Sequence, residues 1–249
     1  MKVDYDGFSG GDRTQIELPS VQQKLLQALQ AAGKPVVFVN CSGSAIAMPW
    51  EATNLTAILQ AWYPGEQGGR AVADVLFGDV NPAGRLPVTF YHATADLPAF
   101  DDYSMSNRTY RYFNGQPDFA FGHGLSYTKF DYNSPKLNGT DFAAGDTIKL
   151  TFSLLNAGTW DGDEVAQVYF RHVNSTRPQP KLALCGFVRI HLQASQGAWL
   201  TMDIPTERFR SWDPAKKQYT VEPGNYELLV GAASDDIRLR VPLKVAATP

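Results

Sequence analysis

Two serines just after an apolar run are the first residues in the chain that could act as nucleophiles. Residues 36–39 are wholly apolar, as in a strand buried on both faces of a parallel sheet, and Ser42 and Ser44 follow closely. A nucleophile elbow needs Gly two residues before and two residues after its serine. Position 40 is Asn and position 46 is Ile, so neither serine fits and we expect no catalytic triad. Small-residue loops at strand ends often line ligand crevices, which leaves ligand contact and ordinary loop packing both open.

Carboxylates are the second candidate chemistry, because glycoside hydrolysis usually needs two of them. One serves as acid and base and the other as nucleophile, about 5 Å apart in retaining enzymes. The sequence alone pairs no two of its acidic residues, and we expect Asp12, next to Arg13, to begin a helix or form an ion pair. The acidic candidates are Asp4, Asp6, Asp12, Glu51, Glu66, Asp74, Asp79, Asp101 and Asp102.

Metal and nucleotide chemistry have little support in the sequence. The 4 histidines are too far apart to match the spacing of metal ligands, so we expect structural or surface roles for His92, His123, His172 and His191. Residues 65–69 are rich in glycine but lack the Gly-Lys-Ser/Thr ending of a phosphate loop. The sequence predicts no metal and no cofactor.

Alternating helices and strands must position these residues in the first half of the chain. A helix is expected from Ser20, which is spaced with Gln23 as a capping box, to a stop at Gly33. Its apolar face would carry Val21, Leu25, Leu26 and Leu29. The strand at 36–39, a short helix at 50–54, a strand at 57–62 and a helix ending at Gly78 would follow. This repetition predicts an α/β fold with a mostly parallel sheet.

The second half has the pattern of an all-β domain. Residues 81–132 are irregular, with one extended strand expected at 108–113. Tyr226 follows a Pro-Gly-Asn turn and is a candidate tyrosine corner. The pattern predicts a β-sandwich of the immunoglobulin or fibronectin type III kind, with strands at 148–155, 165–171, 184–192, 198–204, 218–221, 226–230 and 237–245.

Composition limits the partners. A net charge of −3 gives no long-range attraction to nucleic acid or to an acidic membrane. No apolar run approaches the roughly 20 residues that span a bilayer. The 2 cysteines, Cys41 and Cys185, fall in different halves, so we expect two unpaired, buried thiols. The 5 Trp, 11 Tyr and 14 Phe fit a β-rich core, and they also fit stacking on sugar rings.

Six phrases in a fixed order resemble the C-terminal half of a family 3 glycoside hydrolase. Within that family they are most similar to the β-xylosidase and β-glucosidase branch. The resemblance covers nearly the full length of the chain. The phrases are residues 10–14 (GGDRT, with Ile16, Leu18 and Pro19), 34–37 (KPVV), 61–69 (AWYPGEQGG), 81–90 (NPAGRLPVTF), 108–113 (RTYRYF) and 121–128 (FGHGLSYT).

The resemblance implies a fold with an incomplete catalytic set. Family 3 enzymes usually combine a (β/α)8 barrel, an α/β sandwich and often a fibronectin III-like domain. Their nucleophile is an Asp on the barrel, and the acid/base in this branch is a Glu just before the GGDRT phrase. Residues 1–9 contain no Glu, so both carboxylates are expected to be missing. Residues 1–133 would be a partial α/β/α sandwich with a mostly parallel sheet and a trailing linker, and residues 134–249 a fibronectin III-like β-sandwich.

The resemblance therefore predicts a fragment of a retaining, exo-acting β-glycosidase that contributes pocket walls and domain packing. Its partners would be a β-linked oligosaccharide or aryl glycoside and the missing barrel, with no nucleic acid and no membrane. Residues expected to orient sugar hydroxyls or stack on the ring are Asp12, Arg13, Ser42, Ser44, Trp62, Glu66 and Gln67.

Three further expectations follow. A sheet that starts midway leaves an edge or an apolar helix face uncovered, which predicts self-association or low stability of the isolated chain. The longer protein would be periplasmic or secreted, although residues 1–6 do not begin a signal peptide. The alternative function is a non-catalytic carbohydrate-binding or enzyme-docking module.

Overall fold

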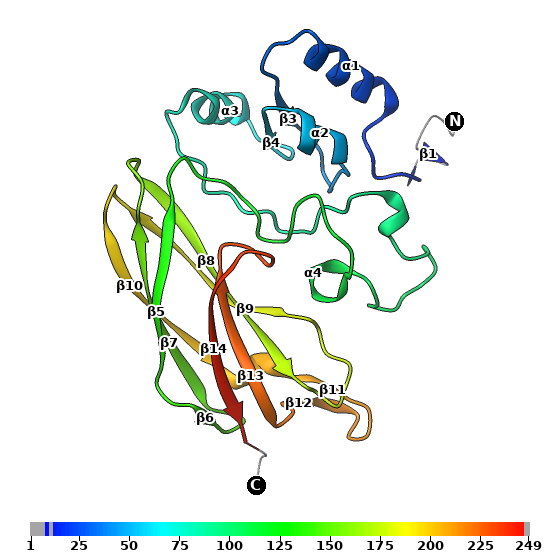
Figure 1. Ribbon diagram of the computed structural model, residues 1–249. Helices are drawn as coiled ribbons and strands as arrows, with labels where there is room; N and C mark the ends of the chain where they lie inside the picture. The colour runs from blue at the N-terminus through cyan, green and yellow to red at the C-terminus, as the bar shows by residue number, and fades with distance from the viewer. Residues whose placement is uncertain (1–7, 10–11, 247–249) are drawn as a thin grey trace. The chain divides into compact units, whose positions relative to one another are not determined.

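The computed structural model describes residues 8–9 and 12–246 (Figure 1). The chain divides into two compact units. Unit 1 comprises Met1–Val80 and Val88–Ala120, and unit 2 comprises Asn81–Pro87 and Phe121–Pro249. The domain boundary after residue 133 stays a prediction. None of the helices in the described ranges is both long and apolar enough to span a membrane.

Unit 1 alternates helices and strands, as the sequence predicts. Strands β3 and β4 pair in parallel, from Val37 opposite Ala57 to Asn40 opposite Gln60. Helix α3 ends where Gly78 adopts a left-handed φ of 84°, which glycine does without a steric penalty. The elements in order are α1 (Ser20–Ala31), β3 (Val37–Asn40), α2 (Pro49–Asn54), β4 (Ala57–Gln60) and α3 (Gly68–Phe77).

Two local predictions in unit 1 are wrong, and one alternative of a third is excluded. Ser20 is the first helical residue of α1, so Pro19 takes the cap position and no side chain caps the helix. Asp12 does not begin a helix, because it lies in the short strand β2 (Asp12–Arg13), which pairs with β1 (Phe8–Ser9). Residues 108–113 are not a strand either. Thr109–Tyr112 forms the one-turn helix α4, which follows the short 3-10 helix η1 (Thr94–Asp96).

Helix α1 leaves most of its apolar face exposed. Leu26 is buried, whereas Val21, Leu25 and Leu29 are 73%, 61% and 47% exposed. These three residues are four apart and form one stripe along the helix. The uncovered helix face predicted from the sequence is therefore present within the described chain.

Unit 2 is a β-sandwich (Figure 1). One sheet has the strand order β10-β7-β5, and the other has the order β6-β14-β13-β8-β9. Within them β6 and β14 pair in parallel, and the other pairs are antiparallel. The sandwich strands are β5 (Phe130–Leu137), β6 (Asp141–Phe142), β7 (Thr147–Asn156), β8 (Gly162–Val173), β9 (Ala183–Leu192), β10 (Gly197–Pro205), β13 (Gly224–Gly231) and β14 (Ile237–Val245).

One predicted strand lies outside the sandwich. Residues Gln218–Thr220 form β12, which pairs with β11 (Ser211–Asp213) in a separate two-stranded hairpin. The sequence pattern did not predict β5, β6 or β11. A short 3-10 helix, η2 (Thr206–Phe209), connects the end of β10 to this hairpin.

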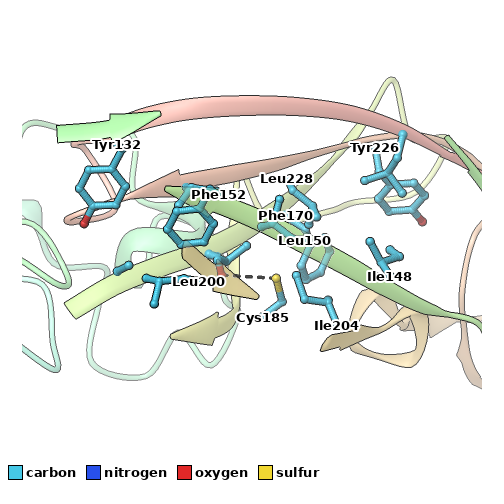
Figure 2. Packing of buried hydrophobic residues seen from close by; sticks show 14 of the residues in the cluster. Tyr132, Ile148, Leu150, Phe152, Phe170, Cys185, Leu200, Ile204, Tyr226 and Leu228 are labelled. Atoms are coloured by element: carbon cyan, nitrogen blue, oxygen red, sulfur yellow. Dashed lines mark hydrogen bonds between the residues drawn. The ribbon is translucent and has the colours of Figure 1, made fainter. Parts of the chain in front are cut away.

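The core of unit 2 lies between its two sheets. Side chains from both sheets interdigitate there, including Phe152 and Leu150 from β7 and Phe170 from β8 (Figure 2). Cys185 belongs to this core, and its thiol donates a hydrogen bond to the carbonyl oxygen of Val168 at 3.3 Å. Cys41 is exposed, so the prediction of two buried thiols is wrong for that residue. Neither cysteine forms a disulfide.

The tyrosine corner predicted from the sequence is present. The hydroxyl of Tyr226, at the start of β13, donates to the carbonyl oxygen of Glu222 at 2.6 Å. The Tyr226 ring stacks on His172, whose side chain is 3% exposed, with ring centroids 4.3 Å apart. Gly224 lies against the same imidazole, where an added Cβ would overlap it. The corner therefore locks the start of β13 onto β8.

Two of the six phrases pair with each other inside unit 2. The amide of Leu86 donates to the carbonyl oxygen of His123 at 2.9 Å, and the amide of Gly122 donates to that of Leu86 at 2.8 Å. Arg85 forms a buried ion pair with Glu164 of β8, at 2.9 Å. These contacts give phrases 81–90 and 121–128 a structural role, because they bind a preceding segment to the sandwich.

Candidate functional site

A cluster of polar side chains lies at the carboxyl ends of β3 and β4. Asn40 and Gln60 are directly opposite each other in the ladder, and the Asn40 amide nitrogen donates to the Gln60 side-chain oxygen at 2.6 Å. Both amides also donate to the hydroxyl oxygen of Ser42, at 3.1 Å from Asn40 and 3.2 Å from Gln60. The two strand ends are thus tied together through one buried serine.

The hydroxyl of Ser42 is used completely by this network. Its oxygen accepts the two amide bonds, and its proton is donated to the backbone carbonyl of Ser44 at 2.9 Å. A serine nucleophile needs an adjacent base to take its proton, and here a carbonyl oxygen holds that proton instead. The structure therefore makes Ser42 a residue that shapes the loop.

Ser44 brings a second segment to the same edge. The Arg13 guanidinium donates to the Ser44 hydroxyl at 2.7 Å, and its Nε donates to the carbonyl oxygen of Gln15 at 3.2 Å. Ser44 is exposed and Arg13 is half-buried. Asp12 precedes Arg13 in β2, opposite Ser9. The structure therefore joins Arg13, Ser42 and Ser44 into one connected group.

Trp62 and Tyr63 follow β4 at this edge. Trp62 has a left-handed φ of 55°, which is uncommon for a bulky residue and marks a sharp turn of the chain. Its half-buried ring meets the ring of Phe90 edge-on, with centroids 6.0 Å apart. The Tyr63 ring lies over Gly43, where a Cβ would come within 2.6 Å of the ring. Trp62 follows the polar cluster closely in sequence. Tyr63 contacts Gly43, in the loop that carries Ser42 and Ser44.

Glu66 and Gln67 are exposed at the start of α3. Gln67 is the cap residue of that helix, and its side chain makes no capping hydrogen bond. Gly68 follows, packed so closely on Pro64 that a Cβ would overlap the proline ring. No hydrogen bond between described residues connects Glu66 or Gln67 to the Ser42 cluster. They belong to a neighbouring loop of unit 1.

Sequence reasoning missed Asn40 and Gln60, and it named Glu51 among the acidic candidates without assigning it a role. Asn40 and Gln60 are polar residues that end apolar strands, and that position was the signal available in the sequence.

Glu51 is fully buried on α2, and one of its carboxylate oxygens has no hydrogen-bond partner within the described chain. Burial raises the pKa of Glu51, and the nearby Asp118 carboxylate raises it further. Asp118 itself accepts from the Met48 amide at 2.8 Å and contacts His92 at 2.7 Å.

The described residues contain no group of three or more His, Cys, Asp or Glu side chains arranged to hold a metal ion. His92 and His191 are exposed beside carboxylates, and the side chain of His172 is buried at the tyrosine corner. Asp4 and Asp6 lie outside the described residues. The side chains at the strand ends can donate and accept hydrogen bonds, and they offer no pair of carboxylates for proton transfer.

Comparison with known proteins identifies the family of this chain. The profile of the glycosyl hydrolase family 3 C-terminal domain matches residues 3–127, half of the chain. The chain belongs to glycosyl hydrolase family 3. A fibronectin type III-like domain profile matches residues 164–234, which lie in unit 2. All seven residues predicted to contact substrate fall inside the family 3 match.

The relatives are considerably longer than this chain. It is 46% identical to the xylan 1,4-beta-xylosidase of Xylanibacter ruminicola, in a match covering 96% of this chain and 27% of that protein. It is 33% identical to the periplasmic beta-glucosidase of Salmonella typhimurium, covering 91% and 31%. The crystal structure of a beta-glucosidase from Kluyveromyces marxianus in complex with glucose superposes with a TM-score of 0.87 at 33% identity, covering 96% and 30%. The chain spans less than a third of these family 3 proteins.

Proposed function

We propose that this chain is part of a retaining, exo-acting β-glycosidase, a β-xylosidase or β-glucosidase, that removes terminal β-linked sugars. The family 3 membership and the 46% identity to a xylan 1,4-beta-xylosidase support this proposal. In the proposal the chain contributes pocket walls and domain packing, and another part of the longer protein supplies both catalytic carboxylates. Substrates would be β-linked oligosaccharides or aryl glycosides.

The proposal includes a larger domain around unit 1. The parallel pair β3–β4 would belong to a mostly parallel sheet in an α/β/α sandwich, and a (β/α)8 barrel would complete the enzyme. The exposed stripe of Val21, Leu25 and Leu29 on α1 fits this proposal, because an apolar face of this kind is normally covered. Without that cover, the isolated chain is expected to self-associate, which light scattering over a range of concentrations would detect.

The Arg13–Ser44 hydrogen bond carries the proposed role in the pocket. It fixes a guanidinium and an exposed hydroxyl next to each other at the carboxyl edge of β3 and β4, where α/β sheets bind ligands. A guanidinium has five donors in a rigid fork, and the bonds from Arg13 to Gln15 and Ser44 leave other donors for sugar hydroxyls. The Asn40–Ser42–Gln60 network holds the loop beneath them, so that both groups keep their geometry.

The remaining predicted residues have different parts in the proposal. Trp62 would offer a ring for stacking on a pyranose, and its strained backbone fits a position set by function. Glu66 and Gln67 are exposed and free to accept or donate hydrogen bonds at the rim. Asp12 would orient a sugar hydroxyl beside Arg13. None of these residues is assigned a proton-transfer role.

A chimera tests the proposal directly. The segment of the Xylanibacter ruminicola xylosidase that matches this chain is replaced by residues 1–249, and kcat/KM is measured with p-nitrophenyl β-D-xyloside. Arg13→Ala in the chimera should lower kcat/KM by about 10- to 100-fold, a loss of about 1.4 to 2.7 kcal/mol of transition-state binding. Thr14→Ala, at an exposed neighbouring position, is the matched control. Equal activity of Arg13→Ala and the unmodified chimera would refute the pocket role.

A further inference from the structure

The β11–β12 hairpin of unit 2 has an inverted distribution of polar and aromatic residues. Side chains alternate between its two faces, and Trp212 is directly opposite Tyr219. Both rings point to solvent, with Trp212 49% and Tyr219 65% exposed. Their centroids are 5.4 Å apart at an interplanar angle of 71°. A hairpin stabilised by folding forces alone would bury its aromatic face and expose its polar one.

The polar face of the hairpin is the anchored one. Ser211 accepts a hydrogen bond from Gln179 at 2.8 Å, and Thr220 accepts one from Arg177 at 3.1 Å. Arg177 also forms an ion pair with Asp213 at 3.6 Å. Ser211, Asp213 and Thr220 share one face of the hairpin. Ser211 and Asp213 flank Trp212 in β11, and Thr220 is directly opposite Ser211, so all three lie on the face opposite to that of the rings.

The buried carboxylate of Glu222 binds the residues that anchor the hairpin. Glu222 accepts from Ser175 at 2.6 Å, from the amide and hydroxyl of Thr176 at 3.0 and 2.8 Å, and from Arg177 at 3.3 Å. The same residue offers its carbonyl oxygen to the tyrosine corner. The hairpin is therefore fixed rigidly to the sandwich by its polar face, and the two rings are held outward.

We propose that Trp212 and Tyr219 form a binding platform for a neutral, β-linked polysaccharide chain, which we call the hairpin platform. Aromatic faces stack on the apolar faces of pyranose rings, and Trp and Tyr provide large contact area at low conformational cost. Two partly exposed rings offer on the order of 200 to 300 Å². A stable protein interface needs about 800 Å² from each partner, so the platform is too small for a second copy of the chain.

The family membership indicates which class of sugar the hairpin platform would bind. Binding of a polymer there goes beyond the proposed function. The relatives are named for action on β-xylosides and β-glucosides, whose longer chains would present successive rings to the platform. Binding here would hold the protein on polymer without using the residues at the ends of β3 and β4. Failure of the platform would leave the chimera test of the proposed function unaffected.

Affinity electrophoresis of the 249-residue chain in native gels tests the platform. Gels contain soluble β-1,4-xylan, mixed-linkage β-glucan or, as an α-linked control, dextran. We expect retardation in at least one β-linked gel and none in dextran, with a tenfold or greater loss of affinity in Trp212→Ala and in Tyr219→Ala. Trp199→Ala is the matched control, because Trp199 is 60% exposed on β10 of the same unit.

Several results would overturn the proposal. These are migration of the wild-type chain unaffected by both β-linked polymers, equal retardation of Trp212→Ala and wild type, or an equal loss in Trp199→Ala. Retardation that disappears in 0.5 M NaCl would assign binding to the exposed Lys216 and Lys217 of the hairpin turn instead. Conversion of an oligomer to a monomer by Trp212→Ala would make the hairpin a contact between copies. Thermal unfolding of each variant verifies that it is folded.

Discussion

Gly124 lies directly against the carbonyl oxygen of Gly84, so closely that a Cβ on Gly124 would overlap that oxygen. Each glycine comes from one of the two phrases that pair inside unit 2. The backbone bonds between Leu86, His123 and Gly122 continue this pairing. The second glycine of the sequence Phe-Gly-His-Gly is therefore explained by a close approach of two backbones.

Replacement of Gly124 by alanine should lower the free energy of unfolding, whereas replacement of Gly84 should not. Gly124→Ala is expected to destabilise the chain by about 1 to 3 kcal/mol, because the backbones must move apart to admit a methyl group. A Cβ on Gly84 would meet nothing within 4 Å, so Gly84→Ala is the matched control. Urea denaturation measures both. Equal stability of the two variants would contradict the close-approach explanation.

Glu222 should make the stability of unit 2 sensitive to acid. Burial alone would raise its pKa, but hydrogen bonds from Ser175, Thr176 and Gln179 outweigh burial and lower the pKa to about 2. A carboxylate with a lowered folded-state pKa contributes stability above its unfolded pKa and loses that contribution as pH falls through the folded value.

The loss is therefore expected between about pH 4.5 and pH 2. Glu222→Gln should cost roughly 3 kcal/mol at pH 7 and flatten the stability profile in that window. Chemical denaturation at a series of pH values gives the profile. An exposed carboxylate changed in the same way, Glu66→Gln, should leave it unaltered. The same steep acid loss in Glu222→Gln would show that another group is responsible.

Glu51 should make the stability of the chain depend on pH in the opposite direction. Burial and the neighbouring Asp118 raise its pKa, so its contribution is complete below the ordinary pKa of a glutamate. The contribution is lost as pH rises through the folded-state value, because the buried carboxylate must then ionise. Glu51→Gln should therefore stabilise the chain at pH 8 by about 1 kcal/mol, with less gain at pH 4. A destabilised variant at pH 8 would mean that Glu51 has an ionic partner in the folded protein.

The two thiols should differ sharply in reactivity. Burial raises the pKa of Cys185 to about 12, and its thiol donates to the Val168 carbonyl inside the core. Cys41 is exposed in the loop after β3. Titration with a chromogenic disulfide reagent at pH 8 should therefore detect one thiol in the native chain and two in guanidinium chloride. Cys41→Ser should abolish the native signal, and a remaining native signal would place Cys185 within reach of solvent.

The sequence predicted the elements with strong local patterns and missed those that depend on distant contacts. The helices at Ser20–Ala31 and Gly68–Phe77 have clear periodicity and glycine stops, and both are present. Residues 108–113 alternate in a way that favours a strand. They form a helical turn because Tyr91, far back in the chain, bonds the Thr109 amide at 2.7 Å and packs on Phe113.

The candidate site shows the same division. Ser42 and Ser44 could be nominated because they follow an apolar strand, and Arg13 because its phrase resembles the family. The Arg13–Ser44 bond spans 31 positions, and no local pattern encodes it. Asn40 and Gln60 were missed, because their partnership depends on the parallel register of β3 and β4.

In the proposed function, this chain supports a glycosidase pocket and another part of the longer protein supplies the catalytic carboxylates. The most direct test compares kcat/KM for p-nitrophenyl β-D-xyloside between the 249-residue chain alone and the Xylanibacter ruminicola chimera that contains it. We predict no turnover above buffer for the chain alone, and turnover within about tenfold of the parent xylosidase for the chimera. Turnover by the chain alone, or a folded chimera without activity, would contradict the claim.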